Sequence, residues 1–143
     1  MEWAALIAWL LTAGGGFIML AIWFQRGGMR QNEQGRIRPA LILSHFALAA
    51  IGLVLWIIYV AADADALAWI AFVLLLVVAA LGFTMFTIWY RQRQATATVA
   101  QAATATGGAP RPAEQHFPVA IVAVHGLAAV TTLVLVLLAA LEV

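Results

Sequence analysis

The chain has 143 residues, of which 66% are hydrophobic and only 9% are charged, and its formal net charge is +1. So few charged side chains cannot cover the surface of a water-soluble domain, and so apolar a composition also excludes an intrinsically disordered chain. The lack of cysteine excludes disulfides and thiolate ligands, and the small net charge gives no reason to expect nucleic acid as a partner. An integral membrane protein remains.

Four apolar stretches follow one another along the chain, at residues 3–24, 39–61, 66–90 and 117–141. None contains Asp, Glu, Lys or Arg, and each exceeds the roughly 20 residues that a helix needs to cross a bilayer. Backbone polar groups in lipid must be satisfied within each segment, which requires helices. We therefore expect an all-α, integral membrane four-helix up-down bundle, forming a single domain over residues 1–143.

The connections differ in length. The turn between the second and third stretches is very short, so these two should form an antiparallel hairpin. Residues 91–116 are rich in Ala, Thr, Gln, Gly and Pro, a composition typical of a flexible linker.

Arginine placement predicts the orientation. All seven basic residues lie in the connection between the first and second stretches or in the connection between the third and fourth. They are Arg26, Arg30, Arg36, Arg38, Arg91, Arg93 and Arg111. The opposite side carries only acidic residues: Glu2, Asp63, Asp65 and Glu142. The positive-inside rule then predicts cytoplasmic connections, two extracytoplasmic termini and a multi-pass location in the inner (plasma) membrane.

Tryptophans recur near the ends of the four stretches, at Trp3, Trp23, Trp69 and Trp89. This position predicts an aromatic belt at the two membrane interfaces.

Two histidines lie inside the apolar stretches, where an ionisable side chain is a candidate functional group. His45 is six residues into the second stretch and His125 eight residues into the fourth, so they lie about 9 Å and about 12 Å deep. Both stretches run in the same direction, which places the two imidazoles in one layer. His116 is nine residues before His125, on the opposite helical face, and should take no part.

Glycines occupy the same layer on the other two stretches. Gly15, within the run 14–16, and Gly82 lie at matching depth. Two histidines with glycines on the intervening helices predict a site for one haem b, ligated axially by His45 and His125, with the glycines leaving room for the macrocycle. Arg38, seven residues before His45, should pair with a haem propionate. A shared haem also predicts that the second and fourth helices are neighbours.

This arrangement resembles the transmembrane b-type cytochromes, in which haem lies between histidines of parallel helices. The resemblance rests on topology, on the two histidines and on the glycine layer, and implies a one-electron transfer protein with a single haem. Separately, the sequence HFPVAIVAVHGLAAVTTLVLVLLAAL at 116–141 is similar to small four-span membrane proteins of GC-rich bacteria, which implies a topology but no activity.

Other interpretations stay open at this point. The histidines could hydrogen-bond across helices, for example to Ser44 or Thr84. The protein would then be a cofactor-free accessory subunit of a larger membrane complex, such as a respiratory complex, or would form a homo-oligomer. A small transporter is disfavoured because no carboxylate lies within an apolar stretch. No combination of nucleophile, base and acid indicates a hydrolase.

Overall fold

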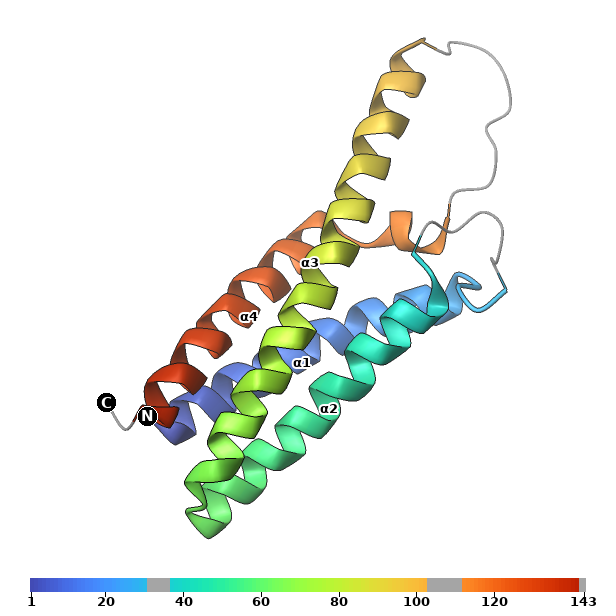
Figure 1. Ribbon diagram of the computed structural model, residues 1–143. Coiled ribbons are helices and arrows are strands. Elements are labelled where there is room, and N and C mark those ends of the chain that lie inside the picture. Colours follow the sequence, from blue (N-terminus) through green and yellow to red (C-terminus); the bar gives the residue numbers. More distant parts are fainter. Residues whose placement is uncertain (31–36, 103–111, 142–143) are drawn as a thin grey trace.

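The computed structural model describes residues 1–30, 37–102 and 112–141, and side chains for all of these except 97–102. The arginines expected at positions 36 and 111 and the glutamate at 142 lie outside the described residues. The elements are α1 (Glu2–Gln25), α2 (Pro39–Ala62), α3 (Asp65–Ala102), the short 3-10 helix η1 (Ala113–His116) and α4 (Val119–Ala140) (Figure 1). The prediction of an all-α chain with four helices long and apolar enough to cross a membrane is confirmed.

Local sequence accounts for the turn between α2 and α3. Asp63 ends α2 in the left-handed conformation, at φ 53°, and its N–H donates to the Tyr59 carbonyl at 2.8 Å. Aspartate tolerates this conformation better than most residues with a side chain. Asp65 then begins α3, where an acidic residue interacts favourably with the helix dipole.

The third helix is longer than its apolar stretch. It continues past Tyr90 to Ala102, because the Gln, Arg and Ala residues that follow are good helix formers. The segment expected to be a flexible linker therefore begins as a helix, and it ends with η1 at Ala113–His116.

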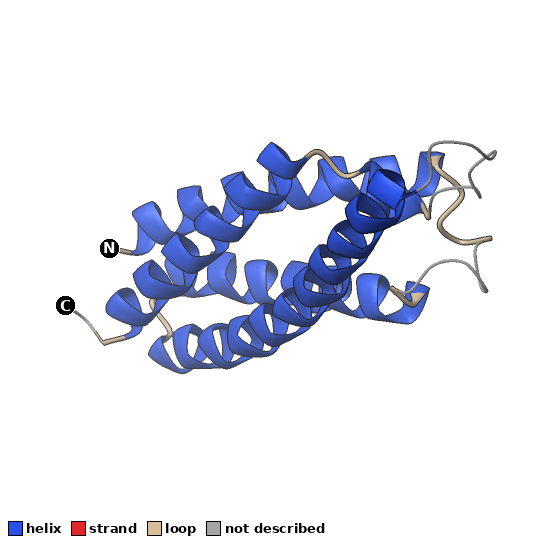
Figure 2. Ribbon diagram, turned by 90° about the horizontal axis from the view of Figure 1, so that it is seen from above, coloured by secondary structure: helices blue, strands red, loops and turns tan. Residues whose placement is uncertain are grey.

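The four helices associate as two closely packed pairs, α1 with α4 and α2 with α3. The pairs meet along the α1–α2 and α3–α4 seams (Figures 1 and 2). Within the described residues, α2 and α4 do not pack against each other, so the prediction that they are neighbours is wrong. They occupy opposite corners of the bundle, and groups on them meet only by reaching across its interior.

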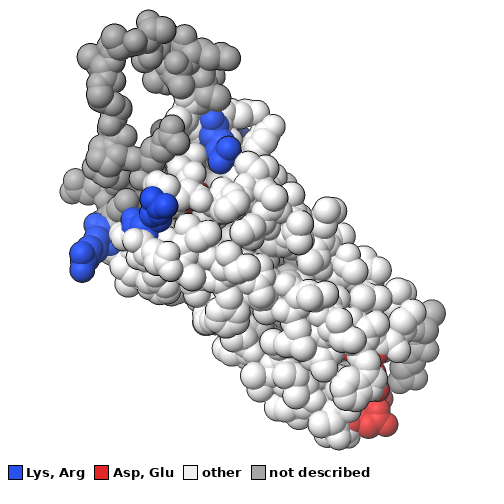
Figure 3. Space-filling view, turned by 180° about the vertical axis from the view of Figure 1, so that it is seen from behind, with Lys and Arg blue, Asp and Glu red and all other residues white. Residues whose placement is uncertain are grey.

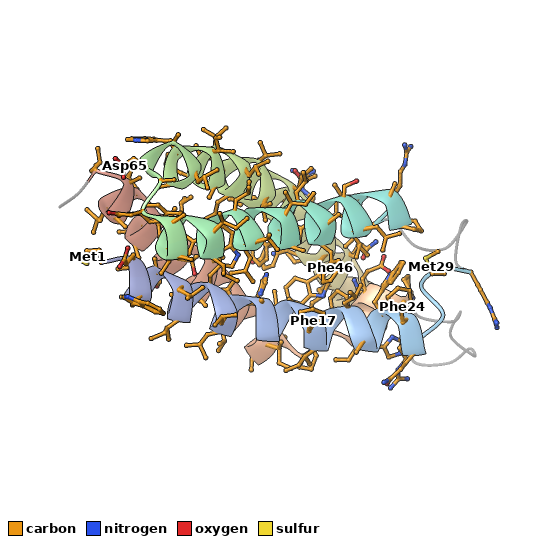
Figure 4. All side chains as sticks on the ribbon, turned by 90° about the horizontal axis from the view of Figure 1, so that it is seen from below. Met1, Phe17, Phe24, Met29, Phe46 and Asp65 are labelled. Carbon is orange, nitrogen blue, oxygen red and sulfur yellow. The ribbon has the colours of Figure 1, made fainter. Side chains whose placement is uncertain are left out.

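The two ends of the bundle differ in charge. The start of α1, the end of α4 and the α2–α3 turn lie at one end, called here the terminal end, and the described arginines lie at the other, the arginine end (Figures 1 and 3). Figure 4 shows the same division, with Met1 and Asp65 at the terminal end and Phe24 and Met29 at the arginine end. The charge asymmetry expected from the sequence is therefore present in three dimensions.

A continuous hydrophobic core fills only the half of the bundle next to the terminal end. Trp9 and Trp56 lie at its centre with ring centroids 6.3 Å apart, and a Cβ on Gly52 would lie 3.1 Å from the Trp9 ring. Beyond this core, each helix has a section without any buried described residue. The buried residues that border this section are Trp9 and Trp23 in α1, Gly52 in α2, Val78 and Trp89 in α3, and Thr132 in α4. His45 and His125 lie within it.

The tryptophans divide into two kinds. Trp3 and Trp69 are 63% and 43% exposed, as residues of an interfacial belt would be. Trp23 and Trp89, in contrast, are buried at the arginine end, which differs from the expectation. Trp23 is covered by the backbone of Gly28, where a Cβ would overlap the indole ring.

Candidate functional site

The two intramembrane histidines face each other across the interior of the bundle. Their ring centroids are 6.4 Å apart and their planes are inclined by 61°. His45 belongs to the α2–α3 pair and His125 to the α1–α4 pair, so the rings meet at the interface between the pairs. Both histidines remain partly exposed, although their rings face each other.

Each imidazole is held by a backbone carbonyl of the helix that packs beside it. The Nδ1 of His45 lies 3.0 Å from the Val78 oxygen of α3, and the Nδ1 of His125 lies 2.9 Å from the Thr12 oxygen of α1. A carbonyl oxygen only accepts, so both Nδ1 atoms donate. In the neutral imidazole the proton is then on Nδ1, and the lone pair of Nε2 is available to a ligand.

Glycines explain how the rings reach these carbonyls. Gly16 follows Thr12 by four residues and Gly82 follows Val78 by four residues, so each glycine lies one helical turn beyond the accepting carbonyl. A Cβ on Gly82 would lie 3.1 Å from Cε1 of His45, and one on Gly16 would lie 3.3 Å from Cε1 of His125. A larger residue at either position would press on the imidazole.

The site is therefore nearly two-fold symmetric, although no repeat is visible in the sequence. In each helix pair, one helix supplies a histidine, and the other supplies a carbonyl and, four residues later, a glycine. Metal-binding histidines are typically held in this way, through a hydrogen bond from the ring nitrogen that does not face the metal.

The separation of the rings fits two ligands on opposite sides of one metal. With metal–nitrogen bonds of about 2 Å and ring centres about 1 Å further out on each side, the two centroids would be roughly 6 Å apart. No group of three or more His, Cys, Asp or Glu side chains lies together among the described residues, so a bare ion would find only two protein ligands here. A haem brings four equatorial nitrogens of its own and needs only the axial pair.

An aromatic pair borders the site at the seam between α1 and α2. Phe17 and Phe46 point toward each other with centroids 5.2 Å apart in an edge-to-face arrangement (Figure 4). Phe46 directly follows His45, and Phe17 directly follows the glycine run of α1. The surroundings are therefore apolar and aromatic, which suits a planar macrocycle.

The sequence placed Gly15 and Gly82 only at the depth of the histidines, whereas the structure places them next to the imidazole rings. A Cβ on Gly15 would lie 3.4 Å from Cβ and Nδ1 of His125, so Gly15 and Gly82 both border the imidazole rings themselves.

Arg38 is exposed at the N-cap of α2, on the arginine-end side of His45. His116 lies apart in η1, where its Nδ1 contacts the Pro112 oxygen at 3.2 Å.

The hydrogen-bond partners suggested from the sequence are not those observed. The hydroxyl of Thr84 donates to the Ala80 carbonyl of its own helix at 2.9 Å, and the acceptor for His45 is a backbone oxygen. Sequence reasoning missed Thr12 and Val78, and it included Gly16 only as part of the glycine run 14–16. A glycine follows each acceptor by four residues, but every residue has a carbonyl, so this spacing alone does not select the two acceptors.

A polar cluster closes the arginine end of the bundle. The Gln92 side chain of α3 donates to the Glu114 carboxylate at 3.2 Å and accepts from Gln115 at 2.8 Å. Glu114 is 1% exposed and Gln92 is 7% exposed, so this network ties η1 onto α3 away from solvent.

No known family model, curated protein or solved structure matches this chain.

Proposed function

We propose that the protein is an integral membrane b-type cytochrome that carries one haem, ligated axially by His45 and His125, and transfers single electrons. The observation that carries this proposal is the pair of opposed imidazoles, 6.4 Å apart, whose Nδ1 atoms both donate to backbone carbonyls. This leaves the Nε2 lone pair of each ring free of that hydrogen bond, in a section of the bundle that has no closely packed core.

When bound, the haem supplies a one-electron couple within the bilayer. The chain's own residues would hold it: His45 and His125 would ligate the iron, and the Val78 and Thr12 carbonyls fix the orientations of the two imidazole rings. Two imidazole ligands would leave no iron position for oxygen or another gas, so the chemistry supplied would be electron transfer and not oxygen activation. Arg38 lies at the membrane edge on the same α2 face, where its charge would balance a propionate.

A reduced-minus-oxidised absorption spectrum of the purified protein tests this function. We expect a Soret band and sharp α and β bands on reduction, as two axial imidazoles produce. A cofactor-free accessory subunit would stay colourless even after hemin is added, and that result would overturn the proposal.

We further propose that the bundle is up-down and lies in the inner (plasma) membrane with its arginine end in the cytoplasm and both termini outside. The charge difference between the two ends supports this orientation.

Because the chain has no cysteine, single cysteines introduced by mutation can be labelled against a clean background. With a membrane-impermeant maleimide on intact cells, Asp63→Cys and Asp65→Cys should react. Arg38→Cys and Arg91→Cys should react only after permeabilisation, and their labelling from outside would contradict the orientation.

Replacing Arg38 by Ala should lower the midpoint potential of the haem. A cation near the haem stabilises the reduced form, which carries one more negative charge, so its removal should shift the potential down by on the order of tens of millivolts. A redox titration measures this shift. Arg30→Ala removes the same charge from the exposed turn after α1 and serves as the control, for which we expect a smaller change. Equal shifts in both variants would contradict a specific role for Arg38.

A further inference from the structure

The indole nitrogen of Trp89 is a buried hydrogen-bond donor without an acceptor. It is the one buried side-chain polar atom for which the described part of the chain provides no partner. The Trp89 side chain is 5% exposed, so water does not readily take this role. A buried donor left unpaired is costly, and buried indole N–H groups usually have a partner.

Trp89 lies on the face of α3 that carries the haem site. It follows Gly82 by seven residues, which is nearly two full turns and about 10 Å along the helix axis. Helical side chains lean toward the N-terminus of their own helix, which for α3 is the direction of Gly82 and the His45 ring. Along α3, Trp89 therefore lies between Gly82, which borders the His45 ring, and Gln92 of the polar cluster.

The charges around Trp89 favour a negatively charged acceptor. The Arg93 guanidinium lies 5.2 Å from the centre of the indole ring. A negatively charged acceptor for Trp89 Nε1 would be attracted by this cation.

We propose that Trp89 Nε1 donates a hydrogen bond to a propionate carboxylate of the haem, so that the propionate edge of the macrocycle faces the arginine end. This inference rests on the proposed haem function. Trp89 is a positioning residue in this account: it fixes which way the ring enters the bundle and slows its release. The same arrangement explains why a tryptophan near the end of a membrane span is turned inward instead of lying in the belt.

The test compares two cofactors in two variants. Trp89→Phe keeps an aromatic ring and removes only the N–H, and hemin dimethyl ester replaces both carboxylates by neutral groups. Haem release from the purified protein to an excess of apomyoglobin gives the dissociation rate. We expect Trp89→Phe to release hemin about tenfold to a hundredfold faster than the wild type, the loss expected for one charge-assisted hydrogen bond. For the dimethyl ester the two proteins should differ by only about twofold.

Trp69→Phe provides the matched control, since it makes the same substitution at an exposed tryptophan near the other end of α3, and its release rate should equal that of the wild type. Equal hemin release from wild type and Trp89→Phe, or the same acceleration with both cofactors, would overturn the inference while leaving the haem function standing. A wild type that binds no hemin would overturn both the inference and the haem function.

If Trp89→Phe does not fold, ultraviolet resonance Raman spectra of the wild type test the hydrogen bond instead. The indole N–H band should shift with hemin but not with the ester, and identical spectra would overturn the inference.

Discussion

Replacing either His45 or His125 by Ala should remove most of the bound haem or convert the remainder to the high-spin form. Each substitution would delete one of the two proposed iron ligands, so any iron that stays bound would be five-coordinate. Haem content per protein and the position of the Soret band measure the result. Adding free imidazole should restore the low-spin spectrum in part, because it can enter the space left by the missing ring.

His116→Ala is the control for this experiment, because His116 lies in η1 and hydrogen-bonds locally. It should keep the wild-type spectrum. If the intramembrane histidines served only to hydrogen-bond between helices, the wild type would be colourless and each mutation would cost on the order of 0.6 kcal/mol of stability. Unchanged haem content in His45→Ala or His125→Ala would contradict axial ligation by that residue.

Gly82→Ala, which adds a single methyl group, should weaken haem binding by roughly tenfold or more. The new Cβ would lie 3.1 Å from Cε1 of His45, so the imidazole must move away from the Val78 carbonyl and from its ligating position. Second-sphere disturbances of this kind typically change metal affinity by about tenfold to a hundredfold. Gly16→Ala should act on His125 in the same way, through a contact of 3.3 Å.

Gly14→Ala separates this steric effect from a general effect on the helix. No atom of another helix lies within 4 Å of a Cβ at Gly14, while the gain in helix propensity, up to about 1 kcal/mol, is the same as at Gly82. Hemin titrations should therefore give a wild-type dissociation constant for Gly14→Ala and a larger one for Gly82→Ala. Equal constants for the two variants would show that the glycine does not position the histidine.

Much of the architecture could be predicted because the membrane constrains it strongly. Apolar length defines four helices, and arginine placement separates the two ends. The end of α3 was harder to predict, since good helix formers extend it beyond the apolar stretch to Ala102. The diagonal position of α2 and α4 was also missed. Two histidines at one depth indicate a shared layer, but depth alone does not distinguish adjacent from opposite corners.

The site was predictable as a set of residue types and not as a set of contacts. His45, His125 and Gly82 could be chosen from their depth in the sequence. The carbonyl acceptors at Thr12 and Val78 could not, because every residue has a carbonyl and only the packing of helices selects one. The inward position of Trp89 likewise depends on how η1 and the end of α3 close the bundle, which no local pattern encodes.

The central claim is that one haem lies between His45 and His125, and a hemin titration of the purified apoprotein in detergent tests it most directly. The account predicts saturation at one hemin per chain, with a low-spin absorption and electron paramagnetic resonance spectrum typical of two imidazole ligands. In the double variant His45→Ala/His125→Ala this saturable binding should be lost. A wild-type protein that takes up no hemin, or one that binds it equally well without both histidines, would contradict the claim.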